Sequence, residues 1–191
     1  MHPKEFNMKK LLSLYFALAL CLIPGIIAYA ADVNTELMDA IRTKNIQKVR
    51  AMISAGANVN TNMDTTNQSG ITPLMATAAS PEAPIEIGKL LLEQGAKVNA
   101  KDWLGWTALM YASYYGQTEL AKLLMNKGAE VNAKSNTGWT PLMYAAYTGQ
   151  IDIGKLLIEN GADVNAKTRE GETALSIAVS RDESGFSELL R

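Results

Sequence analysis

One five-residue phrase, Gly-Ala-x-Val-Asn, occurs four times in this chain of 191 residues. It occupies residues 56–60, 95–99, 128–132 and 161–165, so that the last two intervals are 33 residues each. A fixed period of this length indicates stacked copies of one small supersecondary unit, each of which contacts only its neighbours. The repeat therefore predicts a solenoid, in which no unit buries its apolar face without a neighbour.

A second phrase lies between the copies of the first and predicts where helices begin. It reads Thr-Pro-Leu or Thr-Ala-Leu and starts at Thr72, Thr107, Thr140 and Thr173. In the third copy, Thr140 is a favourable N-cap and Pro141 fits the first helical position, where no amide hydrogen is needed. Gly149 and Gly161 then provide the left-handed conformation that ends a first helix and a second one. Each unit is thus expected to be a helix–turn–helix pair.

Together, the two phrases resemble the ankyrin repeat family over about residues 34–191. The resemblance implies an all-α fold, an ankyrin repeat solenoid of about five helix-turn-helix units with β-hairpin-like fingers. Within a domain of residues 31–191, the units are placed approximately at 34–60, 61–99, 100–132, 133–165 and 166–191. The first unit lacks the threonine phrase and the last lacks the glycine phrase, and both are interpreted as caps of the stack.

One family position differs in every copy of this chain. The family has a histidine after Thr-Pro-Leu, and the residues here are Met75, Met110, Met143 and Ser176. The resemblance implies that the family histidine bridges backbone groups between repeats, so this hydrogen bond is not expected here. Methionine is expected to fill the space as an adaptable apolar side chain.

The N-terminus has the pattern of a secretory signal peptide, assigned to residues 1–30. Lys9 and Lys10 precede an apolar run over residues 11–23, and Ala28-Tyr29-Ala30 is a small-x-small cleavage motif. Cleavage is expected near Ala30/Ala31, and Met8 is an alternative start. Two alternatives remain open. The uncharged stretch of residues 11–31 is long enough for an uncleaved anchor, and Cys21 is a lipidation candidate that the preceding Leu20 disfavours. The expected location is the periplasm, with a secreted or an inner-membrane-anchored protein as alternatives.

The composition after cleavage argues against several functions. The mature chain would carry 15 basic and 18 acidic residues, a net charge of −3, without a basic stripe. Nucleic-acid binding, or membrane binding after cleavage, therefore has no electrostatic support. Cys21 and His2, the only residues of their kinds, lie in the removed segment. We therefore expect no enzyme activity, no cofactor and no metal site. The glycines are interpreted as helix C-caps and finger turns, and Asp102 as a residue that orders a finger.

An aromatic-rich set of positions is the candidate binding surface. The resemblance implies that partner-reading residues lie on the fingers and at the end of the inner helix of each unit. These positions hold Trp103, Leu104, Trp106, Tyr114, Tyr115, Trp139 and Tyr147. We expect them to form one exposed concave strip, because tryptophan and tyrosine dominate interface hot spots. The alternative is that Trp106 and Trp139 stack on each other as packing between repeats. Tyr111 and Tyr144 are expected in the core, where the family has leucine.

The expected function is non-catalytic binding of another protein outside the cytoplasm, by a chain that is itself a monomer. Protective, scaffolding and immunity or inhibitor roles are all compatible with this reading. The alternative is a self-associating structural module that uses the same aromatic strip.

Overall fold

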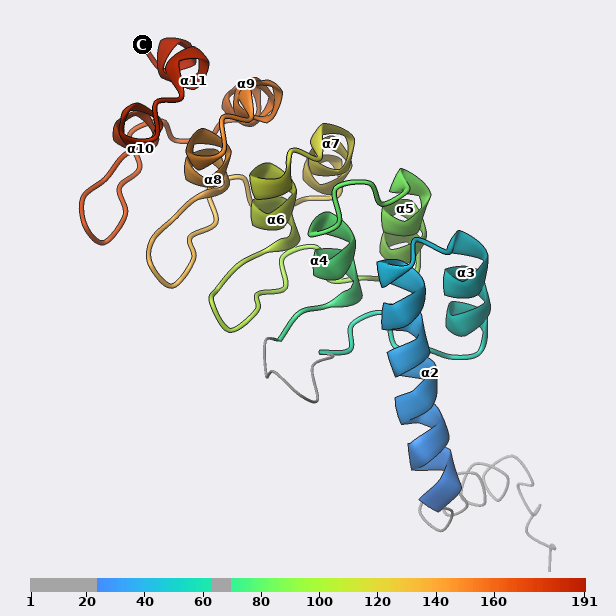
Figure 1. Cartoon of the computed structure of the whole chain (residues 1–191). Coiled ribbons are helices and arrows are strands. Elements are labelled where there is room, and N and C mark those ends of the chain that lie inside the picture. The colour runs from blue at the N-terminus through green and yellow to red at the C-terminus, as the bar shows by residue number, and fades with distance from the viewer. Residues whose placement is uncertain (1–23, 63–69) are drawn as a thin grey trace, which may run out of the picture.

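In the described part of the chain, five pairs of helices stack side by side (Figure 1). The computed structural model describes residues 24–62 and 70–191, with side chains from residue 33 onward. The inner helices are α2 (Pro24–Arg42), α4 (Pro73–Ala78), α6 (Ala108–Tyr115), α8 (Pro141–Tyr147) and α10 (Ala174–Ser180). The outer helices are α3 (Ile46–Ser54), α5 (Ile85–Glu93), α7 (Thr118–Asn126), α9 (Ile151–Glu159) and α11 (Ser184–Leu189). Because each helix contacts the next member of its own layer, the all-α solenoid is confirmed.

The threonine phrase begins an inner helix in each of its four copies. Thr72, Thr107, Thr140 and Thr173 each accept a hydrogen bond from the backbone N–H three residues later. The backbone N–H of each threonine donates in return to the side chain at that later position. The acceptor is a methionine sulfur at 3.4 Å in three copies, and Ser176 Oγ at 2.8 Å in the last. The residues that replace the family histidine thus complete a local capping box.

Small residues let the two layers pack closely. Ala145 and Ala146 of α8 are fully buried beside Leu142, as expected for a narrow apolar face.

Glycines inside the outer helices were not expected, and the interpretation of all glycines as caps and turns is wrong. A methyl group on Gly154 of α9 would lie 2.6 Å from the ring of Phe186 in α11, and Gly88 and Gly185 are similarly close to neighbouring side chains. These glycines bring successive outer helices into contact.

The asparagine that ends the glycine phrase joins each unit to the next. Asn99 Nδ2 donates to the carbonyl of Gly128 at 3.0 Å, and its Oδ1 accepts from the N–H of Glu130 at 2.9 Å. Asn60 and Asn132 make the same pair of bonds to the following copy. The recurrence of the phrase therefore has a direct physical cause, an asparagine ladder between successive units.

Replacing Asn99 by alanine is expected to lower the free energy of unfolding by about 1 kcal/mol, because two partly exposed hydrogen bonds are lost. Urea denaturation measures the change. Asn165 is the matched control, because it ends the last copy and its side chain makes no hydrogen bond within the described part of the chain. An equal loss in Asn165→Ala would contradict a role for the ladder.

The N-terminal helix α2 runs through the predicted cleavage position between Ala30 and Ala31. It packs on α3 and α4, and its buried side chains begin at Val33 and include Leu37 and Ile41. Residues 1–23, which hold the predicted charged and apolar parts of the signal peptide, lie outside the described residues. Within the ranges that are described, no helix is long and apolar enough to cross a membrane. The signal peptide stays a prediction.

Candidate functional site: an aromatic pocket

Within the described residues, three complete fingers project from the inner-helix side of the stack (Figure 1), and a polar side chain orders each one. Asp102 Oδ1 accepts hydrogen bonds from the backbone N–H groups of Leu104 and Trp106 at 2.9 and 2.8 Å. Ser135 Oγ accepts from the N–H groups of Thr137 and Trp139 in the same way. Thr168 Oγ1 accepts one such bond, from the N–H of Glu172. In each finger a backbone bond closes the hairpin, for example from Asp102 N–H to the Trp106 carbonyl at 3.0 Å. The fingers are therefore hairpin-like, as expected, although no strand is assigned in residues 24–62 or 70–191.

Neighbouring fingers are also joined to each other. The N–H of Asn136 donates to the carbonyl of Leu104 at 2.9 Å, and the N–H of Arg169 donates to the carbonyl of Thr137 at 3.1 Å. Asn136 Nδ2 adds a bond of 2.7 Å to the carbonyl of Trp103. The fingers thus form a continuous support for the side chains that they carry.

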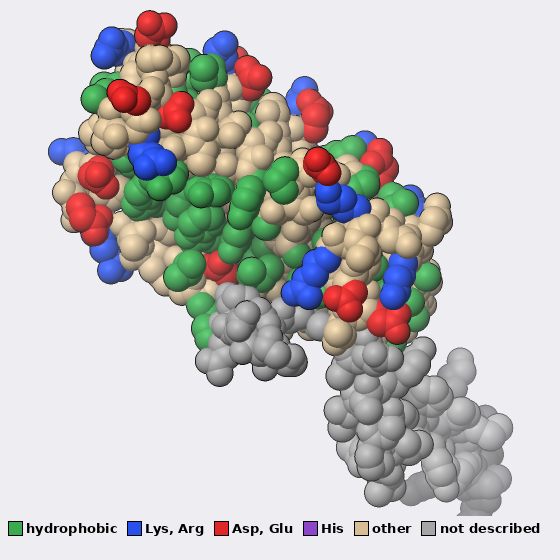
Figure 2. All heavy atoms as spheres, in the orientation of Figure 1, with side chains coloured by type: hydrophobic (Ala, Val, Ile, Leu, Met, Phe, Trp, Pro, Cys, Tyr) green, Lys and Arg blue, Asp and Glu red, His purple; other side chains and the backbone are tan. Residues whose placement is uncertain are grey.

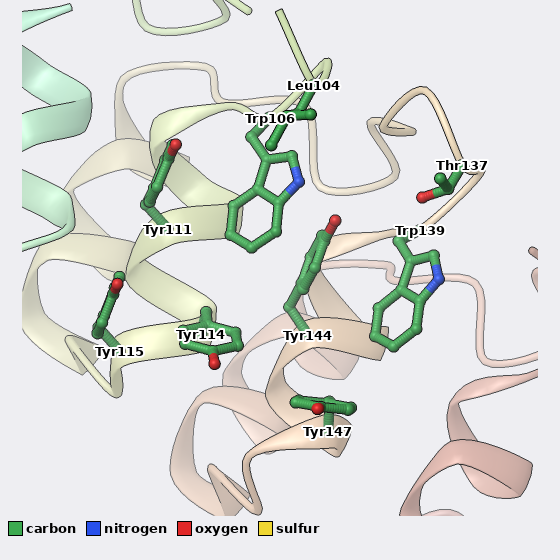
Figure 3. Close-up of a pocket in the computed structure, with 9 residues that line it drawn as sticks. All are labelled: Leu104, Trp106, Tyr111, Tyr114, Tyr115, Thr137, Trp139, Tyr144 and Tyr147. Carbon is green, nitrogen blue, oxygen red and sulfur yellow. The ribbon is translucent and has the colours of Figure 1, made fainter. Parts of the chain in front are cut away.

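An aromatic pocket of about 480 Å³ lies between α6, α8 and their fingers (Figure 3). Its lining residues come from two successive units and are Leu104, Trp106, Tyr111, Tyr114, Tyr115, Thr137, Trp139, Tyr144 and Tyr147. Hydrophobic side chains gather on the molecular surface over the same two helices, and charged side chains lie around them, along the outer helices and toward the ends of the stack (Figure 2). Most of the expected strip is therefore brought together in one place.

Tyr144 is the centre of the cluster. Its ring lies between the two tryptophans, with centroids 4.1 Å from Trp106 and 5.1 Å from Trp139 (Figure 3). The rings of Tyr114 and Tyr147 are 6.2 Å apart, and each contacts one tryptophan. A direct stack of the two tryptophans, the packing alternative, is not what forms, because Tyr144 separates them.

Exposure of the strip is lower than expected for four of its seven residues. Leu104 and Tyr115 are exposed at 63% and 40% of their surface. Trp106, Tyr114, Trp139 and Tyr147 are only partly exposed, because their rings pack against one another and against Tyr144. The expectation that all seven are substantially exposed is therefore wrong for these four, which contribute to packing as well as to the surface.

Trp103 is exposed at 59% but lies apart from the pocket. Its ring lies beside Gly70, where an added methyl group would come within 2.7 Å of it. The close approach joins this finger to the preceding segment. Trp103 is thus available at the surface, although it does not line the same pocket as the other two tryptophans.

Tyr111 and Tyr144 belong to the pocket as well as to the packed interior, which the sequence reasoning missed. Tyr144 is 6% exposed. The Tyr111 hydroxyl donates a hydrogen bond of 2.8 Å to Asp102 Oδ2, and its ring lies 4.9 Å from that of Trp106. A spacing of 33 residues relates Trp106 to Trp139 and Tyr111 to Tyr144, and this repetition was the available signal.

A family model of ankyrin repeats in three copies matches residues 37–135 and 134–191. The chain belongs to the ankyrin repeat family. Ankyrin repeats are in general non-catalytic modules that bind other proteins. The chain is also similar to the rat ankyrin repeat and SAM domain-containing protein 6, with 37% identity over 82 residues. That match covers 42% of this chain and 9% of the rat protein, so the similarity concerns ankyrin repeats alone.

The acidic side chains of this ankyrin repeat stack do not gather into a metal site in residues 24–62 and 70–191. No group of three or more His, Cys, Asp or Glu side chains there could hold a metal ion. Asp102 is buried, but its oxygens accept from two backbone N–H groups and one phenol. This pattern orders the finger, as the family resemblance implied.

Two pocket phenols are expected to resist deprotonation. Burial raises the pKa of Tyr144 to about 12. Burial and then the hydrogen bond to Asp102 also raise the pKa of Tyr111. Unfolded tyrosine ionises near pH 10, so the unfolded state loses these protons before the folded state does. The free energy of unfolding should therefore be unaffected by these groups below pH 10 and fall between pH 10 and pH 12.

Absorbance of tyrosinate during a pH titration measures this difference. The Tyr144→Phe variant should lose part of the absorbance change that occurs near pH 12 in the wild type. If the same change remained in the variant, the assignment of the late titration to Tyr144 would be incorrect.

Proposed function

We propose that this ankyrin repeat protein binds a partner protein through the aromatic pocket and its exposed rim, without catalysis or a cofactor. The observation that carries the proposal is that two successive units place seven aromatic rings and one leucine side chain around one open hollow of about 480 Å³. Pockets of this size with mostly apolar walls are typical of binding sites. Because the hollow lies on fingers that backbone bonds join, it is preformed for docking.

Partner binding is expected to depend most on the exposed rim. Tyr115→Ala should reduce recovery of the partner at least ten-fold in a pull-down, because a hot-spot aromatic is removed from a rigid surface. Val164→Ala is the matched control, since Val164 is also an exposed apolar residue but lies in the glycine phrase, outside the pocket. Equal recovery with both variants would contradict the proposed surface.

Non-covalent binding to the partner would be the whole mechanism, whether it protects, scaffolds or inhibits that partner. We propose that the protein itself is a monomer. Sedimentation of the purified chain separates this state from self-association through the pocket. A dimer that Tyr115→Ala dissociates would favour the self-associating module instead.

The proposed place of action is the periplasm, on the basis of Lys9-Lys10, the apolar run and Ala28-Tyr29-Ala30. N-terminal sequencing of protein from a periplasmic extract should find Ala31 or Asp32 as the first residue. Recovery only in membranes, with Met1 or Met8 retained, would instead identify an uncleaved anchor.

A further inference from the structure

We propose that the aromatic pocket accepts a basic side chain, lysine or arginine, of the partner protein. The inference rests on the proposed function and specifies the chemistry of what binds. It follows from the aromatic walls, from a carboxylate beside them and from a guanidinium that already lies on one of the rings.

Seven aromatic rings line one space. Trp106, Tyr144 and Trp139 are tilted against one another by 47° and 38° in successive pairs. The face of an aromatic ring carries partial negative charge, and tryptophan and tyrosine are the rings that attract cations best. The lining residues include no charged side chain.

Asp102 adds negative charge at the edge of the pocket. It is buried, and no ion pair joins it to a basic group within the described residues. Its Oδ2 accepts from the hydroxyl of Tyr111, a lining residue. A carboxylate that is hydrogen-bonded but not neutralised favours a cation nearby, and its hold on the phenol makes the Tyr111 ring more electron-rich.

The protein already shows the interaction on one of the lining rings. The guanidinium carbon of Arg181 lies 4.3 Å from the ring centroid of Tyr147. Arg181 comes from the end of α10 and does not itself line the pocket. The ring of Tyr147 is therefore placed where it binds a basic side chain, and its contacts with Tyr114 and Trp139 continue the same surface into the pocket.

A titration with small probes tests the charge preference without the partner. The probes are n-butylguanidinium and its uncharged isostere n-butylurea, and n-butylammonium with 1-butanol. Trp103→Phe leaves Trp106 and Trp139 as the only tryptophans, both in the pocket, so their fluorescence reports binding. Each cation should bind at least five-fold more tightly than its uncharged analogue. The cation that binds more tightly identifies whether arginine or lysine is the preferred side chain.

Two variants should change this preference in opposite directions. Asp102→Asn should weaken binding of the cations about three-fold or more, and Arg181→Gln should strengthen it about two-fold by removing a like charge. Neither should change the affinity for n-butylurea. Circular dichroism and urea denaturation check that both variants are folded, and Arg181→Gln keeps the test valid if Asp102→Asn disturbs its finger.

Equal or tighter binding of the uncharged probes, or no saturable response to any probe by the folded protein, would overturn the proposed basic side chain. Either result would leave the pull-down with Tyr115→Ala unaffected, so the proposed protein binding is judged separately. If n-butylurea and 1-butanol are preferred, the pocket takes an uncharged apolar side chain.

Discussion

Tyr144→Ala is expected to lower the free energy of unfolding by about 3 kcal/mol, the cost typical of truncating a large buried aromatic side chain. Tyr144 is almost fully buried, and its ring contacts those of Trp106, Trp139 and Tyr114. Removal would leave a hollow between two tryptophans and end several aromatic pairs, each of which contributes about 0.5–1.5 kcal/mol beyond its buried area.

Urea denaturation followed by circular dichroism measures the loss. Tyr115→Ala is the control, because Tyr115 is exposed and contacts only the ring of Tyr114 among the described aromatic pairs. Its loss should be below about 1 kcal/mol. If Tyr144→Ala lowered the free energy of unfolding less than Tyr115→Ala, Tyr144 would not be the residue that stabilises the aromatic cluster.

Phe186→Ala is expected to unfold the last helix pair while the preceding units stay folded. Phe186 is the largest fully buried side chain of α11 and packs against Gly154 of α9. Its truncation should cost about 3 kcal/mol. In a repeat stack the stability of an end unit depends on a single interface, so this loss falls on α10 and α11 rather than on the whole chain.

Hydrogen exchange locates the effect. Protection of residues 174–189 should fall strongly in Phe186→Ala, whereas protection of α6 and α8 should change little. Val179→Ala is the control, because Val179 lies in the same helix pair but is exposed. A uniform loss of protection over all five pairs would mean that the stack unfolds as one cooperative body.

The helices and their order could be predicted from the sequence because their signals are local. A threonine that caps a helix and a glycine that ends one act within a few residues, as the helices that follow Thr107 and Thr140 show. The asparagine of the glycine phrase was visible too, but its partners lie in the next copy, about 30 residues away. Only the structure reveals what it binds.

The pocket was predicted in part, and the errors have two physical origins. The sequence reasoning assigned each position either to the surface or to the core. The rings of Trp106 and Tyr144 are large enough to pack in the interior and to line the pocket at the same time. Tyr144 was assigned to the core and is indeed buried, yet it also forms a wall of the pocket. Trp103 was grouped with Trp106 because both occupy finger positions that read partners in the ankyrin family, although the finger turn places the two rings apart.

The asparagine ladder has a consequence for how such a protein changes over generations. Each asparagine of the ladder binds only the copy that follows it, so duplication of a 33-residue segment such as residues 133–165 would recreate the bonds of the ladder. The duplicate would also bring a second set equivalent to Trp139, Tyr144 and Tyr147. A single recombination event within the gene could therefore lengthen the stack and add a further aromatic hollow, turning one point of attachment into two.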